Sequence, residues 1–149
     1  MSHVLKPHTA LAPWVLLCGL AAFCLGGTVA SFAQSAGESV QGETLQGDPA
    51  RGEHIYERCF ACHAIDRDRT GPRHAGLFGR VAGSVPGFPY SAAMKQAGLR
   101  GLVWNAKTLD AFLENPTGYI PGTRMGYAGI KDAQERADLI AYLQKATQP

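Results

Sequence analysis

The sequence predicts an all-α protein in which short helices are joined by long loops. Two segments, residues 105–115 and 132–146, space their apolar side chains three and four residues apart, as amphipathic helices do. Residues 70–90 are punctuated by glycine and proline without a helical period, which is typical of a loop. No stretch of the sequence alternates apolar and polar residues convincingly, as a half-buried strand would.

The N-terminal third of the chain is predicted to lie outside this domain. Residues 11–29 are almost wholly apolar and follow a short front segment that holds Lys6, a pattern typical of export. The segment is either a signal peptide, residues 1–33, cleaved after a small-x-small triplet that ends at Ala33, or an uncleaved transmembrane anchor. We expect cleavage, because two glycines and the small-residue site follow the apolar run where processing requires them.

Residues 34–47 are polar and glycine-rich, so we expect a flexible linker before a single domain at residues 48–149. Of the 14 basic and 12 acidic residues, cleavage would remove Lys6 alone and leave 13 basic and 12 acidic side chains. This balance argues against nucleic acid or an anionic membrane surface as the main partner. The export segment predicts a soluble protein of the bacterial periplasm, or one anchored to the inner membrane and facing the periplasm if the segment is retained.

The domain is predicted to open with a helix that leads to a pair of cysteines. Asp48 is a favourable N-cap, and Pro49 suits the first helical position. We expect the helix to run through Ile55 and Tyr56 as far as the cysteines.

Three more helices are expected further along the chain. The first covers residues 90–97 and should stop at Gly98. The next covers residues 105–115 and should end at Pro116. Its inner face is predicted to hold Leu109, Phe112 and Leu113. The last helix begins at the cap residue Asp132 and should pack on the first one. Its apolar repeat consists of Leu139, Tyr142, Leu143 and Ala146.

This architecture is expected to bury only a small apolar core. About 100 structured residues with so much loop bury little apolar surface for the conformational entropy that they lose. A large apolar cofactor would complete the core.

The strongest chemical signal is the motif Cys-Phe-Ala-Cys-His at residues 59–63. Cysteines three apart on a helix project to one side, so Cys59 and Cys62 can form thioethers to the two vinyl groups of one porphyrin. His63 would then lie under the iron as the proximal ligand. The motif therefore predicts one covalently attached haem c.

Other uses of Cys59 and Cys62 agree less well with the sequence. Zinc needs about four ligands, and no second Cys-x-x-Cys or His-x-x-x-His pair supplies the rest. A thioredoxin-like redox pair calls for a βαβ setting, and no predicted strand precedes Cys59. A disulfide across two intervening residues is chemically possible in an exported protein but would stabilise it little.

From residue 47 to residue 143 the chain resembles the class I cytochromes c, the mitochondrial cytochrome c and bacterial cytochrome c2 type. The resemblance implies the fold of that family, with short helices and long loops wrapped round one covalent haem and the N- and C-terminal helices packed together. The matching segments are Cys-Phe-Ala-Cys-His at 59–63, Thr-Gly-Pro at 70–72, Gly-Leu-Phe-Gly-Arg at 76–80, Pro-Gly-Phe at 86–88, Trp104, Leu-Glu-Asn-Pro at 113–116 and Tyr-Ile-Pro-Gly-Thr-Arg-Met at 119–125.

The resemblance implies roles for residues outside the cysteine motif. Met125 would be the second axial ligand, on the haem face opposite His63. A soft sulfur suits haem iron, and the Pro-Gly turn before it can hold the loop rigidly. Pro72 would accept a hydrogen bond from the other ring nitrogen of His63, which fixes the imidazole. The residues implied to donate hydrogen bonds around the haem propionates are Arg80, Tyr90 and Trp104.

Three other residues are candidate ligands, and Phe112 differs from the residue that many members of the family have at that position. Met94 lies on the apolar face of a predicted helix, where packing is the expected role. His54 precedes the motif on the same helix and cannot easily reach the opposite haem face. His74 stands where the family usually has an apolar residue; we expect a loop or packing histidine, with ligation as the alternative. Phe112 stands where many members have a tyrosine that donates towards the methionine sulfur.

With both axial positions filled, the iron cannot bind a substrate, so we predict a soluble one-electron carrier and not an enzyme. The alternatives are a haem enzyme or gas-binding protein with an open iron position, and a fixed electron-transfer subunit of a larger oxidoreductase. The expected partners of a monomer are redox proteins: a bc1-type complex, a terminal oxidase, a photosynthetic reaction centre or a dehydrogenase. Members of the family often dock through lysines around the haem edge, but the chain after residue 33 has only Lys95, Lys107, Lys131 and Lys145, which disfavours this mode of docking.

Overall fold

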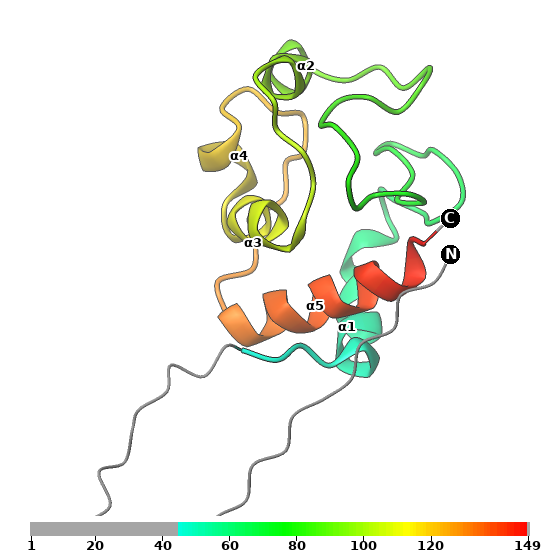
Figure 1. Ribbon diagram of the computed structural model, residues 1–149, viewed down its shortest axis with the longest axis vertical. Coiled ribbons are helices and arrows are strands. Elements are labelled where there is room, and N and C mark those ends of the chain that lie inside the picture. The colour runs from blue at the N-terminus through cyan, green and yellow to red at the C-terminus, as the bar shows by residue number, and fades with distance from the viewer. Residues whose placement is uncertain (1–44, 149) are drawn as a thin grey trace, which may run out of the picture. The chain divides into compact units, whose positions relative to one another are not determined.

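A computed structural model describes residues 45–148 of the chain, and their regular secondary structure is helical. In chain order the elements are α1 (Pro49–Tyr56), the 3-10 helix η1 (Glu57–Cys59), α2 (Ala92–Leu99), α3 (Ala106–Glu114), α4 (Pro116–Tyr119) and α5 (Ala133–Ala146) (Figure 1). The described residues form no strand and a single isolated bridge, between Val81 and Val103. The all-α prediction is confirmed. The predicted signal peptide, residues 1–33, and most of the linker at 34–47 lie outside the described residues.

Helix α1 begins as the sequence predicts, but it ends before the cysteine motif is complete. The Asp48 side chain accepts a hydrogen bond from the Ala50 amide, and Pro49 occupies the first turn. The helix then tightens into η1, and Cys62 lies in the turn that follows, so the expectation of one helix through both cysteines is wrong. The reason is that the Cys62 carbonyl accepts its hydrogen bond from Gly71 at 2.7 Å, which folds the next loop back on the motif.

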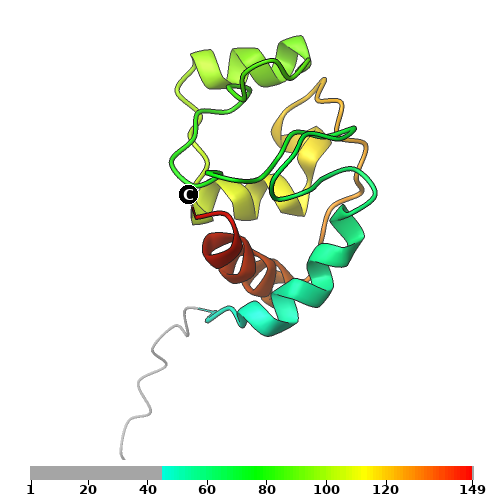
Figure 2. The same ribbon diagram turned by 90° about the vertical axis from the view of Figure 1, so that its right-hand side faces the viewer.

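The terminal helices pack on each other, as predicted. Helices α1 and α5 lie side by side in both ribbon views (Figure 2). Gly52 is buried at the crossing, where a Cβ atom would collide with the Asp138 carbonyl oxygen. One turn later the fully buried ring of Tyr56 lies 5.2 Å from that of Tyr142, and Leu139 is fully buried beside them. The helix pair therefore holds the segment that leads into the cysteine motif.

The buried carboxylate of Asp138 ties the N-terminus of α1 to α5. It accepts hydrogen bonds from the Asp48 backbone amide at 2.7 Å, from Nε of Arg51 at 2.7 Å and from the Gln134 side-chain amide at 2.9 Å. The residue is only 3% exposed, although Arg51 itself faces solvent. The Arg51 hydrogen bond holds the pKa of the Asp138 carboxyl well below its ordinary value of 3.8, so this group is ionised in the folded protein.

We expect Asp138→Asn to lower the free energy of unfolding at pH 7 by about 1–3 kcal/mol, because it unpairs buried hydrogen-bonding groups while the exposed Arg51 is resolvated. A carboxyl group whose pKa is lowered by folding stabilises the protein above the unfolded pKa, near 4, and this stabilisation is lost as the pH falls. Urea unfolding at pH 7 and pH 3 should therefore show a larger acid loss in the wild type than in the variant. Asp66→Asn, which alters an exposed ion pair, is the control. Parallel losses in wild type and Asp138→Asn would contradict the assignment.

The middle helices form near their predicted positions, but α2 begins at Ala92 and not at Tyr90, and α4 was not predicted. Ser91 caps α2 by accepting from the Met94 amide at 3.1 Å. The predicted stop at Gly98 is wrong, since α2 continues to Leu99. This glycine serves close packing instead, because a Cβ atom there would collide with the Ala82 carbonyl. Helix α3 opens with a capping box, and the proline that ends it also begins α4.

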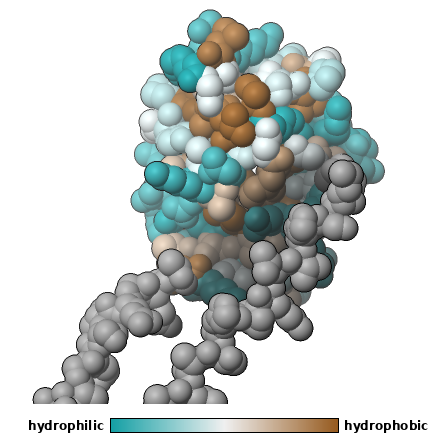
Figure 3. Space-filling view, in the orientation of Figure 1, coloured by the Kyte–Doolittle hydropathy of each residue, from teal (hydrophilic) through white to brown (hydrophobic). Residues whose placement is uncertain are grey.

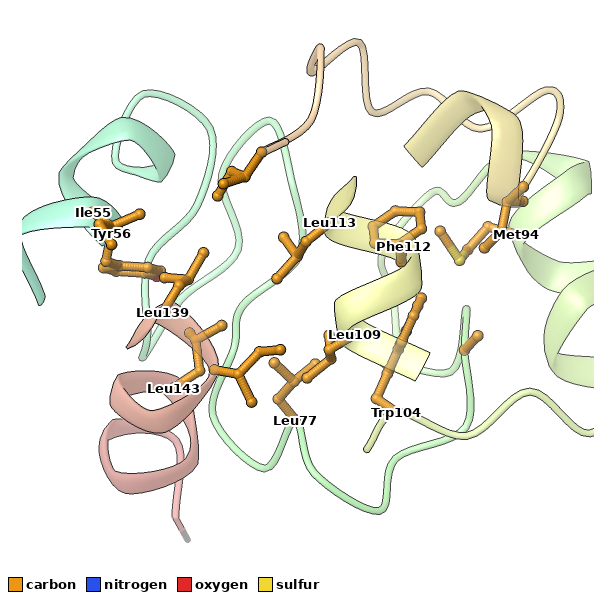
Figure 4. Close-up of a cluster of buried hydrophobic side chains, with 14 of the residues drawn as sticks. Ile55, Tyr56, Leu77, Met94, Trp104, Leu109, Phe112, Leu113, Leu139 and Leu143 are labelled. Carbon is orange, nitrogen blue, oxygen red and sulfur yellow. The ribbon is translucent and has the colours of Figure 1, made fainter. Parts of the chain in front are cut away.

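The core has two groups of side chains joined through the middle (Figure 4). Tyr56 and Leu139 belong to the group between α1 and α5, whereas Trp104, Phe112 and Met94 lie at the other end of the cluster. The buried residues drawn between the two groups are Leu77, Leu109 and Leu113. The predicted inner face of α3 is buried as expected.

Candidate functional site

The two cysteines of the motif are free thiols placed by η1 and the turn after it. Cys59 is partly buried against the core, whereas Cys62 is exposed. Burial raises the pKa of the Cys59 thiol to about 11, so this thiol is protonated at neutral pH. A redox-active cysteine pair has instead a lowered thiol pKa. No group of three or more His, Cys, Asp or Glu residues among residues 45–148 is arranged to hold a metal ion.

The ring of His63 is fixed by the loop that follows the motif. Its Nδ1–H donates a hydrogen bond to the Pro72 carbonyl at 2.8 Å, which leaves Nε2 as the nitrogen available for a metal. Gly71 lies so close that a Cβ atom there would collide with the imidazole. Burial lowers the pKa of His63, partly offset by the Pro72 hydrogen bond, so the ring is held neutral, the form that binds metals.

The structure places Arg80 next to both Trp104 and Tyr90. A backbone hydrogen bond joins Arg80 to Trp104, and the Tyr90 hydroxyl interacts electrostatically with the Arg80 guanidinium. The Trp104 amide donates to the Arg80 carbonyl at 2.9 Å, next to the Val81–Val103 bridge. The Arg80 guanidinium is half-buried and donates to the carbonyls of Ala75 and Arg73, at 2.9 and 3.0 Å. Burial lowers its pKa, an effect partly offset by the Tyr90 hydroxyl.

The half-buried charge of Arg80 would suit an anionic ligand. Within residues 45–148 its guanidinium forms no ion pair with a carboxylate. A cation taken partly out of water is costly unless an anion or strong acceptors compensate it. Trp104 is buried, with its ring centroid 5.0 Å from that of Phe112. The cluster thus combines an apolar wall with a cation that suits a carboxylate-bearing ligand.

Met125 lies in the loop between α4 and α5, partly buried against the same core as Cys59. Its amide donates to the Thr123 hydroxyl at 3.3 Å, and Arg124 anchors the loop by donating to the Pro89 carbonyl at 2.9 Å. Gly122 adopts a φ of 87°, the left-handed conformation that glycine tolerates best, so the turn before Met125 is specified locally.

The other candidate ligands take different places. Met94 is 8% exposed in α2 and packs in the core, and His54 is exposed beside Glu57. His74 is partly buried, and its ring stacks on that of His63 with the centroids 4.3 Å apart and the planes 19° from parallel. Burial lowers the pKa of His74 to about 3, with the charges of His63 and Arg80 adding to the effect.

Sequence reasoning missed the contact between His74 and Tyr56. The Tyr56 hydroxyl lies 3.0 Å from Nδ1 of His74, within hydrogen-bond distance. The signal available in the sequence was the polar residue at position 74, where an apolar one is usual. Its partner could not be inferred, because 18 residues separate the two positions.

Apolar residues are exposed on one face of the described part of the chain. On the face shown in Figure 3, apolar residues gather in the upper half of the view, beneath α2. Partly buried apolar side chains that pack against the core include Phe78, Leu102 and Tyr127. A bound apolar group would cover apolar residues exposed in this way.

The donor set fits a haem. Two free thiols stand beside a neutral imidazole with one free nitrogen, and a half-buried guanidinium and a methionine thioether lie nearby. Thioether attachment, nitrogen and sulfur ligation and propionate binding require these groups. The fold and the site thus define a protein built round a covalently attached haem.

Comparison with known proteins gives the family. The sequence model described as Cytochrome c matches residues 49–147, so the chain belongs to the cytochrome c family. It carries covalently attached haem c, for which Cys59 and Cys62 have the required spacing. The predicted family and cofactor are confirmed.

Relatives of known name agree with this assignment. The chain is 47% identical to cytochrome c2 of Afifella marina over 98 residues, which make up 64% of this chain and 79% of that protein. It is 47% identical to cytochrome c of Chlamydomonas reinhardtii over 109 residues, 70% of this chain and 95% of that protein. Among solved structures, cytochrome cH from Methylobacterium extorquens superposes with a TM-score of 0.63 at 37% identity, covering 66% of this chain and 99% of that one.

The family is one of electron-carrying haem proteins, which agrees with the predicted class of function. Within residues 45–148, none of the helices has the length and apolar character needed to cross a membrane.

Proposed function

We propose that the protein is a soluble one-electron carrier in which His63 and Met125 are the two axial ligands of the haem iron. The observation that most supports this is the hydrogen bond from His63 Nδ1–H to the Pro72 carbonyl, because it leaves Nε2 as the single free ring nitrogen. The haem supplies one iron centre that changes its charge by one electron. With His63 and Met125 bound to that iron, no position is left for a substrate, so the proposed activity is transport and not catalysis.

The residues of the site have separate roles in this proposal. Pro72 orients His63 and raises the basicity of its imidazole. Arg80, Tyr90 and Trp104 would hold the propionates of a bound haem, and the half-buried Arg80 would supply the countercharge. The apolar surroundings and the thioether of Met125 both favour the ferrous state, because each disfavours the extra positive charge of ferric iron.

The absorption and EPR spectra of the native protein test this proposal. A His/Met pair is a strong-field ligand set, so we expect low-spin ferric haem with the weak sulfur-to-iron band near the red end of the visible spectrum. Carbon monoxide should not bind the native ferrous protein at neutral pH. A high-spin ferric spectrum together with rapid carbon monoxide binding would instead favour a haem enzyme or gas-binding protein with an open position.

We infer that the carrier works in the bacterial periplasm as a monomer. Its partners would be redox proteins of the bc1-complex, terminal-oxidase, reaction-centre or dehydrogenase type. The inference is supported by the apolar export segment before Ala33 and by the named bacterial relatives. A fixed subunit of a larger oxidoreductase remains the second candidate for this domain, and co-purification from native membranes distinguishes the two.

Mass spectrometry of the native protein tests the export proposal. We expect the mature chain to start near Gln34 and to be recovered in the periplasmic fraction, because a small-residue site follows the apolar run. A chain that keeps residues 1–33 and sediments with the membranes would show that the segment is an anchor.

A further inference from the structure

The hydroxyl of Tyr56 ends a side chain that is fully buried between α1 and α5. A buried phenol needs a hydrogen-bond partner, since losing its hydration without one is costly. In the part of the chain that the structure describes, its partner is Nδ1 of His74 at 3.0 Å. Figure 4 shows Tyr56 at the end of the core that faces Leu139 and Leu143. The pair therefore connects the terminal-helix interface to the loop that carries His74.

The imidazole of His74 in turn lies flat against that of His63. The ring centroids are 4.3 Å apart and the planes differ by 19°, whereas the rings of Tyr56 and His74 are tilted by 57°. The hydrogen bond at Nδ1 fixes how the His74 ring is turned, and a flat ring can stack on its neighbour in only a narrow range of orientations. His63 is thus held by the Pro72 carbonyl at its Nδ1 edge, by the close backbone of Gly71, and by a stacked aromatic face.

We propose that Tyr56 and His74 are positioning residues that set the ring plane of His63 through a hydrogen bond and a stacked contact. The proposal rests on the proposed function, in which His63 is an axial ligand. One hydrogen bond from Nδ1 leaves an imidazole some freedom to swing, and a second contact on its face removes it. The orientation of an axial imidazole affects the energies of the iron d orbitals. A change in the ring plane of His63 should therefore change the spectroscopic signals of the haem iron.

A purely structural role for the same pair has different energetics. Two polar groups that satisfy each other in a core add little net stability, and replacing both by apolar groups of similar shape is close to neutral. Removing only one of them leaves the other buried without a partner. Stability alone therefore reports the hydrogen bond, whereas only the haem signals report the orientation of His63.

The test uses the haem-loaded protein with Tyr56→Phe, His74→Leu, their double variant and His74→Gln. His54→Gln, an exposed histidine on α1, is the matched control. The ferric EPR g values and the paramagnetically shifted haem-methyl NMR signals report the His63 ring plane, the reduction potential reports the iron, and the urea midpoint reports stability. Tyr56→Phe removes one oxygen and keeps the ring, so it is the variant best suited to retain the fold.

We expect Tyr56→Phe and His74→Leu each to lower the urea midpoint and to shift the g values and methyl signals. The double variant should recover part of the urea midpoint while its haem signals stay shifted. His74→Gln keeps an acceptor for Tyr56 but lacks a ring, so its midpoint should lie above that of His74→Leu while its g values still shift. His54→Gln should match the wild type in every readout.

Unchanged g values and methyl signals in Tyr56→Phe and His74→Gln, with only the urea midpoint altered, would overturn the positioning role and leave a packing pair. That outcome differs from failure of the proposed function. If His63 and Met125 were not the ligands, the wild type itself would lack the low-spin His/Met spectrum. A normal wild type with unresponsive variants would contradict the positioning role alone.

Discussion

Cys59→Ala combined with Cys62→Ala should leave little folded protein and no covalent haem. The described chain has four α-helices of at least eight residues joined by long loops, and apolar residues lie at its surface beneath α2. A small domain that buries this little apolar surface depends on the bound group for its stability. The expected result is loss of colour and of the cooperative thermal transition, measured by absorption and circular dichroism on purified protein.

The wild type supplies the complementary measurement. Its colour should remain with the protein through denaturation and acid-acetone extraction, because thioether bonds survive both. Cys18→Ala with Cys24→Ala is the matched control, since these cysteines lie in the segment predicted to be removed. Haem that extracts freely from the wild type would contradict attachment through Cys59 and Cys62.

Local chemistry made much of the fold predictable. The cap residues Asp48, Asn105 and Asp132 each accept a hydrogen bond from an amide in the first turn of the helix they begin, as their side chains favour. The helix ends were less predictable because tertiary contacts decide them. In the sequence, Gly98 has the appearance of a helix stop signal. In the structure, a glycine is needed there because the backbone lies against the Ala82 carbonyl, and no local sequence pattern reveals that contact.

The site also contains some residues that local sequence predicts and others that it does not. Cys59, Cys62 and His63 are contiguous, and their chemistry can be read from the sequence alone. Pro72 and Met125 entered through the family resemblance, because nothing in the spacing of a proline or a methionine identifies it as part of a haem site. The Tyr56 to His74 contact was not predictable by either route. It depends on a loop that folds back onto α1, and on a polar residue where the family usually has an apolar one.

Met125→Ala should convert the haem from low spin to high spin and is the decisive test of the carrier function. Alanine has no atom that can bind iron, so the axial position proposed for the thioether would open. The reduction potential should fall, because the ferric state would lose the ligand that disfavours it. Carbon monoxide and azide should bind the variant. Absorption and EPR spectroscopy follow the spin state, and a potentiometric titration follows the potential.

Met94→Ala is the control that separates ligation from packing, since it removes the other methionine of the described residues. Met94 is 8% exposed in the core, so its truncation should lower the free energy of unfolding by about 2–4 kcal/mol through the cavity it leaves. Its spectrum should remain that of low-spin haem, and so should those of the His74 variants, because that ring stacks on His63. If Met94→Ala or His74→Leu abolishes the low-spin state while Met125→Ala preserves it, the sixth ligand is not Met125. The loop that Gly122 and Arg124 hold in place would then need another role.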